Sequence, residues 1–401
     1  MKRFGWILVL LMAASPAWAA RTVTVKQLND LLVSLQQSKK TDAEVAAELK
    51  QIVLSEELTR AAMNALVQYV PGPLSTEQIY VLEARSAMLA PPAADLPSTP
   101  APDAVAQKAI LDKATDYASK TYAQLPPLTA TKTTLRFQDN IEAAAASSGL
   151  HSSATDISVG NNAVLASQFV HYINSTERPV ELVNGGEKVD PGKDKGQWGQ
   201  NGQIALLGQG PVLNTVLDEA LASGKISWLR WETVNTHQTA VFSFSVDKKK
   251  THYAVNYCCF PDVDQTGVAN FSGQNGAGAP KGSPGAPGGA KGNFQTNTSW
   301  KNYKATVPYH GELFVDLDTG IVVRLITVAE FKSSDVVHQE DQRIDYGPVA
   351  VDGKTLVLPG KTVVNTEVAS NGESAAAGKY NTRHTLLTAE YKDYKPAGAA
   401  Q

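Results

Sequence analysis

The pattern of hydrophobic and polar positions changes its period along this chain of 401 residues. Over residues 309–367, β-branched and aromatic residues form short alternating or continuous runs, which is typical of strands. The runs are separated at residues 316–320 and at Asp352-Gly353, and both separators have the composition of tight reversals. The pattern therefore predicts an antiparallel meander, and we expect the rest of the fold to be organised around it.

The first part of the chain has a helical period instead. Thr24 with Gln27 and Thr41 with Glu44 match the capping box, and each pair precedes apolar residues at helical spacing. Two more helices are predicted to start at Ser55 and Ser75, and a fifth over residues 103–124, after a Pro/Ala-rich linker at residues 91–102. We expect these helices to form a small bundle beside the sheet.

From Thr129 onward the period is close to two, with one interruption. The predicted strands cover residues 131–137, a hairpin of residues 169–174 and 180–183, three strands within residues 225–260, the meander, and residues 382–394. The interruption is a helix over residues 210–224, bounded by Gly210-Pro211 and Gly224. The predicted class is α+β, with about eight to ten antiparallel strands in a curved sheet, a half-barrel, and a helix packed across it.

The amino terminus has the composition of a secretory signal. Lys2 and Arg3 precede an apolar run, and the chain then reads Ala17-Trp18-Ala19, an A-x-A cleavage pattern. We expect cleavage after Ala19 and a periplasmic or secreted protein. The apolar run of the signal is too short to span a bilayer as a helix, and no other stretch approaches its length. The predicted organisation is a signal peptide (1–19), a helical region (20–125), and a β domain (126–396) with flexible insertions near 261–300 and 369–380.

The two cysteines are adjacent, at the end of a predicted strand. Neighbouring Cα atoms lie about 3.8 Å apart, less than the roughly 4.4–6.8 Å that a disulfide usually spans. Cys258 and Cys259 are therefore either two thiols on opposite faces of a strand or a strained, redox-active pair.

Charge and motifs exclude several functions. A formal net charge of −3 with 19% charged residues argues against a nucleic-acid groove, which needs a basic stripe. Residues 353–355 and 360–362 read Gly-Lys-Thr, but the earlier glycine of a phosphate loop is missing from both, and the chain has no G-x-S-x-G motif. The sequence indicates no cofactor.

One strand carries a possible acid/base or metal cluster. His310, Glu312 and Asp316 fall on the same face of a predicted strand, because strand side chains alternate. A metal site needs three or four converging ligands. An ordinary polar sheet face accounts for the same pattern, and we keep both interpretations.

Aromatic residues are concentrated in the three strands within residues 225–260. Trp228 and Trp231 are predicted on opposite faces of the first strand. Phe242 and Phe244 share a face of the second strand, and Tyr253 shares a face of the third with Val255 and Tyr257. A sheet that is apolar on both faces must be covered on both or curve around something apolar. These five residues are candidate walls of a ligand cavity, and a plain core beneath the helices is the alternative.

The hairpin G-E-L-x-V-D-x-x-T-G-x-x-x-R at residues 311–324 resembles that of the LolA/LolB and RseB-like half-barrel superfamily of bacterial envelope proteins. The order of segments from residue 129 to residue 394 is also similar to a group of secreted proteins of unknown function from acidobacteria-like genomes. The half-barrel resemblance implies a curved antiparallel sheet with an apolar cavity for acyl chains, and a lipid or lipoprotein ligand.

Three hypotheses follow. The first is a non-enzymatic envelope protein that binds an apolar or lipidic ligand, or a partner chain, on its curved sheet. The second is a hydrolase, metal-dependent or acid/base, that uses His310, Glu312 and Asp316. The third is a scaffold whose helical half docks another envelope protein.

Overall fold

The computed structural model describes residues 21–121, 124–138, 170–188, 205–206, 210–234, 237–261, 300–333, 335, 337–369 and 382–398. The predicted signal peptide and the interiors of both predicted insertions lie outside these residues. So do the side chains of Cys258 and Cys259.

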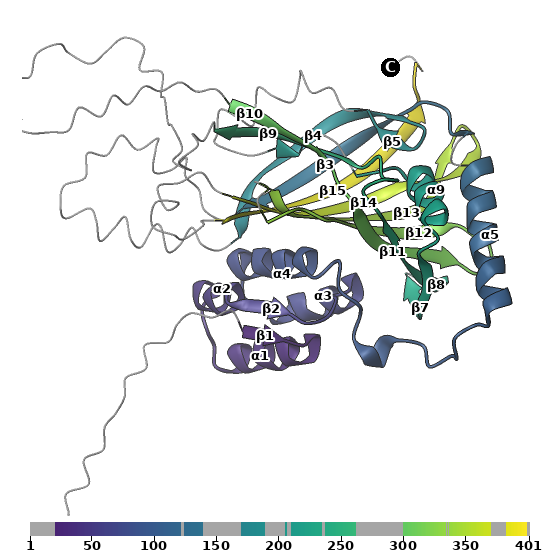
Figure 1. Ribbon diagram of the computed structural model, residues 1–401. Helices are drawn as coiled ribbons and strands as arrows, with labels where there is room; N and C mark the ends of the chain where they lie inside the picture. Colours follow the sequence, from purple (N-terminus) through teal and green to yellow (C-terminus); the bar gives the residue numbers. More distant parts are fainter. Residues whose placement is uncertain are drawn as a thin grey trace, which may run out of the picture.

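A ten-stranded antiparallel sheet, here called the main sheet, forms the centre of the described structure (Figure 1). It is curved and does not close on itself, so the predicted α+β class with a curved antiparallel sheet is confirmed. In spatial order its strands are β5 (Gly186–Glu187), β4 (His171–Val183), β3 (Leu128–Gln138), β15 (Thr382–Pro396), β14 (Lys354–Ala369), β13 (Val337–Val351), β12 (Val322–Ala329), β11 (Tyr309–Asp316), β8 (His237–Val246) and β7 (Ile226–Val234).

Tight turns join these strands, including both of the reversals predicted in the meander. Asp352 and Gly353 have φ angles of 48° and 74° and connect β13 to β14, as a turn with two left-handed residues requires. Asn184 and Gly185 connect β4 to β5 in the same way, with φ angles of 51° and 78°. Gly320, at φ 75°, ends the turn between β11 and β12. Local turn chemistry therefore sets the order of the meander.

The helical unit, residues 21–90, has its own core on one side of the main sheet. It contains α1 (Val25–Gln37), α2 (Asp42–Lys50), α3 (Arg60–Leu66), the 3-10 turn η1 (Val67–Tyr69), α4 (Pro73–Arg85) and a parallel pair of strands, β1 (Arg21–Val23) and β2 (Ile52–Leu54). Both predicted capping boxes are present, at Thr24 with Gln27 and at Thr41 with Glu44. Leu28, Leu32 and Leu49, at most 1% exposed, fill this core.

The opposite face of the main sheet is covered by other elements. These are α5 (Ala104–Lys120), α9 (Leu213–Ser223) and a small sheet with the order β10 (Trp300–Thr306), β9 (Ala254–Pro261) and β6 (Ala205–Leu206). Ala114 and Ala118 of α5 belong to the same core as the main sheet. The fifth predicted helix therefore packs with the β domain, separated from the helical unit by a linker that contains η2 (Ala93–Asp95).

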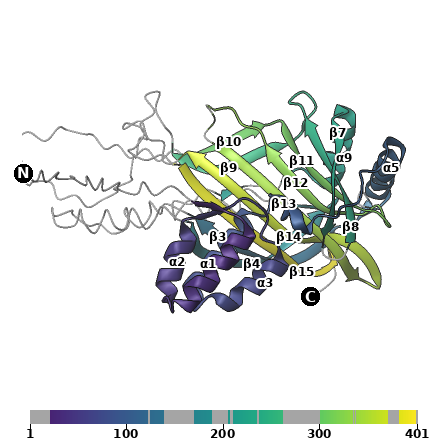
Figure 2. The ribbon, with the colours of Figure 1, turned by 90° about the horizontal axis from the view of Figure 1, so that it is seen from below.

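Figure 2 shows the helical unit beneath one part of the main sheet, with α5 and α9 at the far end. The described structure thus has three layers. The region where the helical unit meets the main sheet is called the seam below. Within it, Val81 and Ala84 of α4 and Ala87, which follows this helix, pack on Phe137, Val363 and Leu386 of β3, β14 and β15.

Several local predictions are wrong. The third helix does not begin at Ser55; residues 52–54 pair with β1, and Thr59 is the N-cap. The fourth begins at Pro73, because Asp42 of α2 accepts hydrogen bonds from the amides of Leu74 and Ser75 at 3.0 and 2.9 Å. The predicted hairpin of 169–174 and 180–183 is the single strand β4. Each error comes from a contact distant in sequence.

Within the described residues no helix combines the length and apolar character needed to cross a membrane.

Gly311 of β11 is a position where the sheet tolerates no side chain. A Cβ atom there would overlap the backbone oxygen of Ile326 on β12 and lie 2.9 Å from the ring of Phe244. We expect Gly311→Ala to lower the free energy of unfolding by roughly 1–3 kcal/mol, because the neighbouring strand must move. Urea denaturation measures the change.

Gly347→Ala is the matched control, because a Cβ at Gly347 has nothing within 4 Å. It should change the free energy of unfolding by less than about 0.5 kcal/mol. Equal effects of the two substitutions would contradict the close approach of β11 and β12.

Candidate functional site

The five aromatic residues predicted as cavity walls lie in the core on the α9 face of the main sheet. Trp231, Phe242, Phe244 and Tyr253 are at most 9% exposed, and Trp228 packs beside them. Trp228 and Trp231 are in contact, with ring centroids 4.6 Å apart, so the prediction of opposite faces is wrong. The cause is a register shift between Trp228 and Arg230, which leaves Leu229 as an extra residue on β7.

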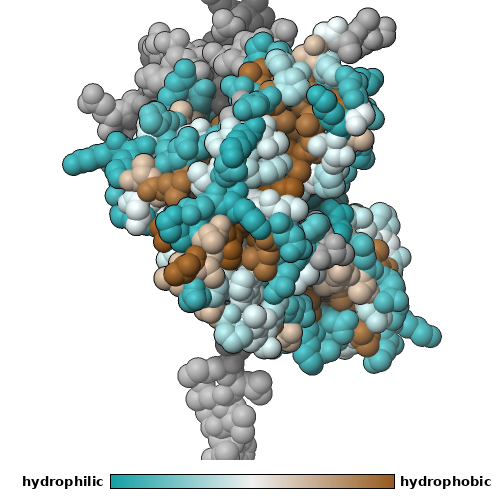
Figure 3. Space-filling view, turned by 90° about the vertical axis from the view of Figure 1, so that its right-hand side faces the viewer, coloured by the Kyte–Doolittle hydropathy of each residue, from teal (hydrophilic) through white to brown (hydrophobic). Residues whose placement is uncertain are grey.

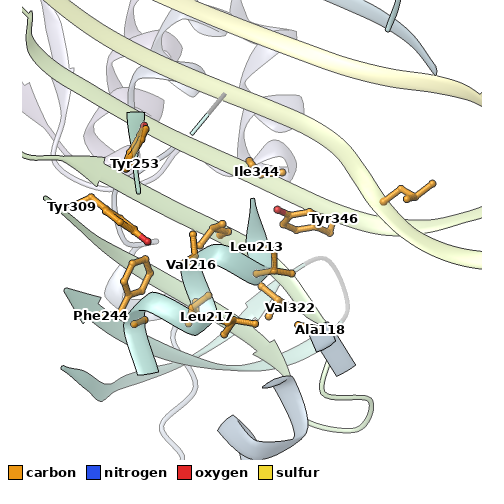
Figure 4. Close-up of a cluster of buried hydrophobic side chains, with 14 of the residues drawn as sticks. Ala118, Leu213, Val216, Leu217, Phe244, Tyr253, Tyr309, Val322, Ile344 and Tyr346 are labelled. Carbon is orange, nitrogen blue, oxygen red and sulfur yellow. The ribbon is translucent and has the colours of Figure 1, made fainter. Parts of the chain in front are cut away.

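Ring contacts continue across the core. Phe244 and Tyr253 both meet Tyr309 edge to face, at centroid distances of 5.9 and 5.3 Å. Figure 4 shows Leu213, Val216 and Leu217 of α9 turned toward this cluster. The hydroxyl of Tyr309 donates to Glu219 at 2.8 Å, and burial together with this carboxylate raises the pKa of the phenol. The aromatic residues therefore pack against α9 and one another.

The predicted polar residues share one face of β11, but each has a different partner. His310 Nδ1 lies 3.0 Å from Glu330, Glu312 accepts two hydrogen bonds from Arg230, and Asp316 lies 2.7 Å from His237 Nδ1. Among the described residues no three histidine, cysteine or acidic side chains are grouped so that they could hold a metal ion.

Glu312 is one end of a chain of ion pairs that reaches the helical unit. The network consists of Glu312, Arg230, Glu232, Arg324, Asp345, Arg343 and Glu57, in that order, and successive partners are 2.8, 2.8, 3.4, 2.6, 2.9 and 2.5 Å apart. Six of these residues lie on β7, β11, β12 and β13 of the main sheet. Glu57 comes from the helical unit, so the ion-pair network crosses the seam.

The network is largely removed from solvent. The side chains of Glu57, Arg324 and Arg343 are only 6%, 9% and 11% exposed. The guanidinium groups of Arg230 and Arg324 lie 5.6 and 5.2 Å from the ring of Phe314, which is fully buried beneath them. Arg343 also donates to the backbone carbonyl of Ala87 at 3.0 Å. Each buried charge thus has several partners, as burial requires.

The two sheet carboxylates that flank Arg324 respond differently to this setting. Burial alone would raise the pKa of Asp345, but the guanidinium groups of Arg343 and Arg324 outweigh it and hold that pKa well below its usual range. Burial raises the pKa of Glu232, and Arg230 and Arg324 only partly oppose the rise. Two carboxylates whose pKa values are shifted in opposite directions are suited to acid/base chemistry. Here both carboxylates form ion pairs with Arg324, so they act as its counterions.

Beside the network the seam is hollow. A cavity with a volume of about 550 Å³, here called the charged cleft, lies there between the helical unit and the main sheet. Five residues of the ion-pair network line it: Glu57, Glu232, Arg324, Arg343 and Asp345. Its other lining residues include the charged Arg60, Glu83, Asp95 and Lys361, and Gly347 and Gly360. Glu83 pairs with Lys361 at 2.7 Å and with Arg60 at 3.5 Å. Both signs of charge therefore line one cavity between two separately packed units.

A smaller cleft lies on the other side of α4. It has a volume of about 230 Å³, and its walls come from β2 and α4 of the helical unit and from β13, β14 and β15 of the main sheet. None of the five aromatic candidates is among the described lining residues of either cleft.

The outer surface at the α5 end is a further part of the described structure. It is mainly hydrophilic, with apolar patches between the hydrophilic side chains (Figure 3). Val105 of α5, Leu221 of α9 and Leu229 of β7 are the large apolar side chains exposed on these three elements. The two clefts described above lie in the seam instead, so we place the candidate site there.

Sequence reasoning identified Glu312 but missed the rest of the network. The available signal was the alternation of charged residues in β13, where Arg343 and Asp345 flank Ile344. That pattern also describes a strand with one solvated face, and it does not show that a helical unit covers the face.

Comparisons of the chain with protein-family models, with curated proteins and with solved structures find no match.

A double-mutant cycle measures the attachment across the seam. Glu57→Gln and Arg343→Met should each lower the free energy of unfolding by about 1–3 kcal/mol, because each removes one partner of a buried charge. Arg343 keeps Asp345 in the first variant, and Glu57 keeps Arg324, 3.6 Å away, in the second. The double variant should be more stable than the sum of the single losses predicts, by about 0.5–3 kcal/mol.

The pair Lys26 and Asp30, whose side chains are 84% and 60% exposed, is the control, and its cycle should show no measurable coupling. If the Glu57 and Arg343 cycle also shows no coupling, this bond contributes nothing to the attachment.

Asp345 gives the network a pH dependence. Its folded-state pKa lies below the unfolded value of about 3.9, so its contribution to stability is present above about pH 4 and is lost as the pH falls below that value. The folded-state pKa of Glu232 is raised, so its contribution to stability is larger at low pH and is lost as the pH rises.

Urea denaturation at pH 5 and pH 3 should therefore show a smaller acid-induced loss of stability in Asp345→Asn than in the unmodified protein. An equal loss in the two proteins would show that Asp345 is not held ionised by its arginines.

Proposed function

We propose that this protein is exported and acts as a non-enzymatic binding protein of the cell envelope, holding a segment of a partner polypeptide in the charged cleft. The signal-like amino terminus supports export. The observation that carries the binding proposal is the charged cleft itself, a cavity of about 550 Å³ between two units. Pockets at the junction of two packed units are a common location for ligands.

The lining chemistry supports a polypeptide over an acyl chain. Arg60 and Lys361 supply positive charge, and Glu83 and Asp95 supply negative charge, within one cleft. An acyl chain satisfies none of these groups, and removing them from water without partners is unfavourable. A peptide segment carries amide groups and side chains of both signs, so it can replace the lost water contacts.

The ion-pair network favours binding in another way. Because Arg324 and Arg343 are fixed by several carboxylates, the charges of the cleft are already oriented before a ligand enters. Preorganised groups lower the cost of binding, since fewer side chains must be ordered.

Gly347 allows the cleft to be filled without disturbing the fold. It lines the cleft, and a Cβ there has nothing within 4 Å. In selections from a displayed random-peptide library, the unmodified protein should enrich peptides that carry both acidic and basic residues. Gly347→Trp should weaken binding of the enriched peptides at least tenfold, which is about 1.4 kcal/mol, because the indole occupies the cleft.

Gly347→Ala is the control and should retain the binding. If no peptides are enriched, or if the tryptophan and alanine variants bind equally well, the charged cleft is not the site.

An acyl ligand among the five aromatic residues stays a prediction. It requires α9 to move, because Leu213, Val216 and Leu217 belong to the same packed core as Phe244 and Tyr309. Titration of delipidated protein with a fluorescent fatty acid tests it. Saturable binding that Phe244→Ala weakens severalfold would support this ligand, and a flat titration at high protein concentration would contradict it.

A further inference from the structure

The linker, residues 91–102, passes from one face of the main sheet to the other on its way from the helical unit to α5. Figure 1 shows it running below β7 and β8 to the lower end of α5. Pro91 and Asp95 of the linker line the charged cleft, and so do residues 232–234, the last three of the edge strand β7. The linker is therefore part of the wall of the charged cleft, on the side where β7 ends.

One hydrogen bond ties the middle of the linker to β7. The indole Nε1 of Trp231 donates to the backbone oxygen of Pro100 at 2.8 Å, and within the described residues this is the hydrogen bond that joins the linker to the main sheet. Residues 93–95 and 98–101 are exposed. A segment with few buried contacts opens at a low cost in free energy, so Trp231 acts as a latch.

Proline makes the linker stiff. It contains five prolines, and the backbone angles at Pro92 (φ −50°, ψ 137°) and Leu96 (φ −80°, ψ 134°) lie near those of polyproline II. Proline-rich segments of this kind are semi-rigid spacers. At the α5 end, Gln107 donates to the backbone oxygen of Pro102 at 2.7 Å. The linker can therefore move as a strap that is attached at both ends and lifts off β7 when the latch opens.

Asp95 gives the strap a charge that no other group neutralises. The other charged side chains that line the charged cleft are already paired, five of them in the ion-pair network, and Glu83 with Lys361 and Arg60. Asp95 is exposed, and its carboxylate has no hydrogen-bond or ion-pair partner among the described residues. A cationic group in the cleft can therefore pair with Asp95 without breaking an existing ion pair.

We propose that the linker is a strap that closes over a polypeptide in the charged cleft and pairs Asp95 with a lysine or arginine of that polypeptide. This role of the linker rests on the function proposed above and specifies the kind of side chain that the cleft prefers. Opening of the strap breaks the bond from Trp231 to Pro100 and admits the polypeptide. A cationic side chain that pairs with Asp95 then favours the closed state, because it binds that state more tightly.

Cleavage of the unliganded protein by elastase, which accepts small residues, tests the strap by itself. Trp231→Phe keeps an aromatic ring but removes the N–H donor. Cleavage within residues 93–101 should become about fivefold faster, the factor that corresponds to one lost hydrogen bond, because proteolysis follows the population of the open state.

Trp228→Phe is the matched control. Trp228 packs against Trp231, but within the described structure it has no hydrogen bond to the linker. This variant should be cleaved at the rate of the unmodified protein, and circular dichroism should confirm that both variants are folded. Equal cleavage rates of the two variants would overturn the strap.

Isothermal titration with a peptide enriched in the selection described above tests Asp95. Asp95→Asn should weaken binding of this peptide about two- to fivefold, the range expected for an exposed ion pair. A copy of the peptide with glutamine in place of lysine and arginine should bind the two proteins equally. Asp112→Asn is the control, since Asp112 is an exposed carboxylate of α5 outside the charged cleft, and it should leave binding unchanged.

Failure of the strap and failure of the proposed function give different results. If the enriched peptide binds Asp95→Asn and Asp112→Asn equally well, or if the glutamine copy is weakened by Asp95→Asn to the same extent, Asp95 does not read a cationic side chain, while the cleft remains the binding site. If the selection enriches no peptide, the proposed function and the role of the strap are both overturned.

Discussion

The bond between Glu57 and Arg343 is the contact on which the arrangement of the two units depends. Glu57 is the member of the ion-pair network that the helical unit contributes, and its carboxylate lies 2.5 Å from the guanidinium group of Arg343. The apolar part of the seam consists of Val81, Ala84, Ala87 and Met88 on Phe137, Val170, Val363 and Leu386, and Met88 also packs on the cluster around Phe314. Apolar contact gives limited directional preference, whereas buried charges must find specific partners. The network therefore fixes where the helical unit sits.

Both clefts are consequences of that arrangement. The helical unit approaches the main sheet through α4, and the two cavities lie on either side of this helix. One cavity is lined by charges of both signs, and the other by mainly apolar side chains of the helical unit and mainly polar side chains of the sheet. The same contact thus creates two cavities of different chemistry. The aromatic core on the other face of the sheet serves a different purpose, because its rings are packed against α9.

Local features of the fold were predictable from sequence, and contacts between distant segments were not. The capping box at Thr24 and the left-handed turn at Asp352-Gly353 depend on neighbouring residues, so the sequence alone specifies them. The extra residue Leu229 depends on the pairing of β7 with β8, which periodicity does not reveal. Arg343 occupies an alternating strand position that looks solvated, and only the covering helical unit makes it a buried partner of Glu57.

Hydrogen–deuterium exchange of the unmodified protein and of Arg343→Ala tests most directly whether the ion-pair network attaches the helical unit to the sheet. Amides of α4 and β2 should lose protection in the variant, while those of β11, β12 and β14 should keep theirs. Unchanged protection of α4, or an equal loss throughout the main sheet, would contradict it.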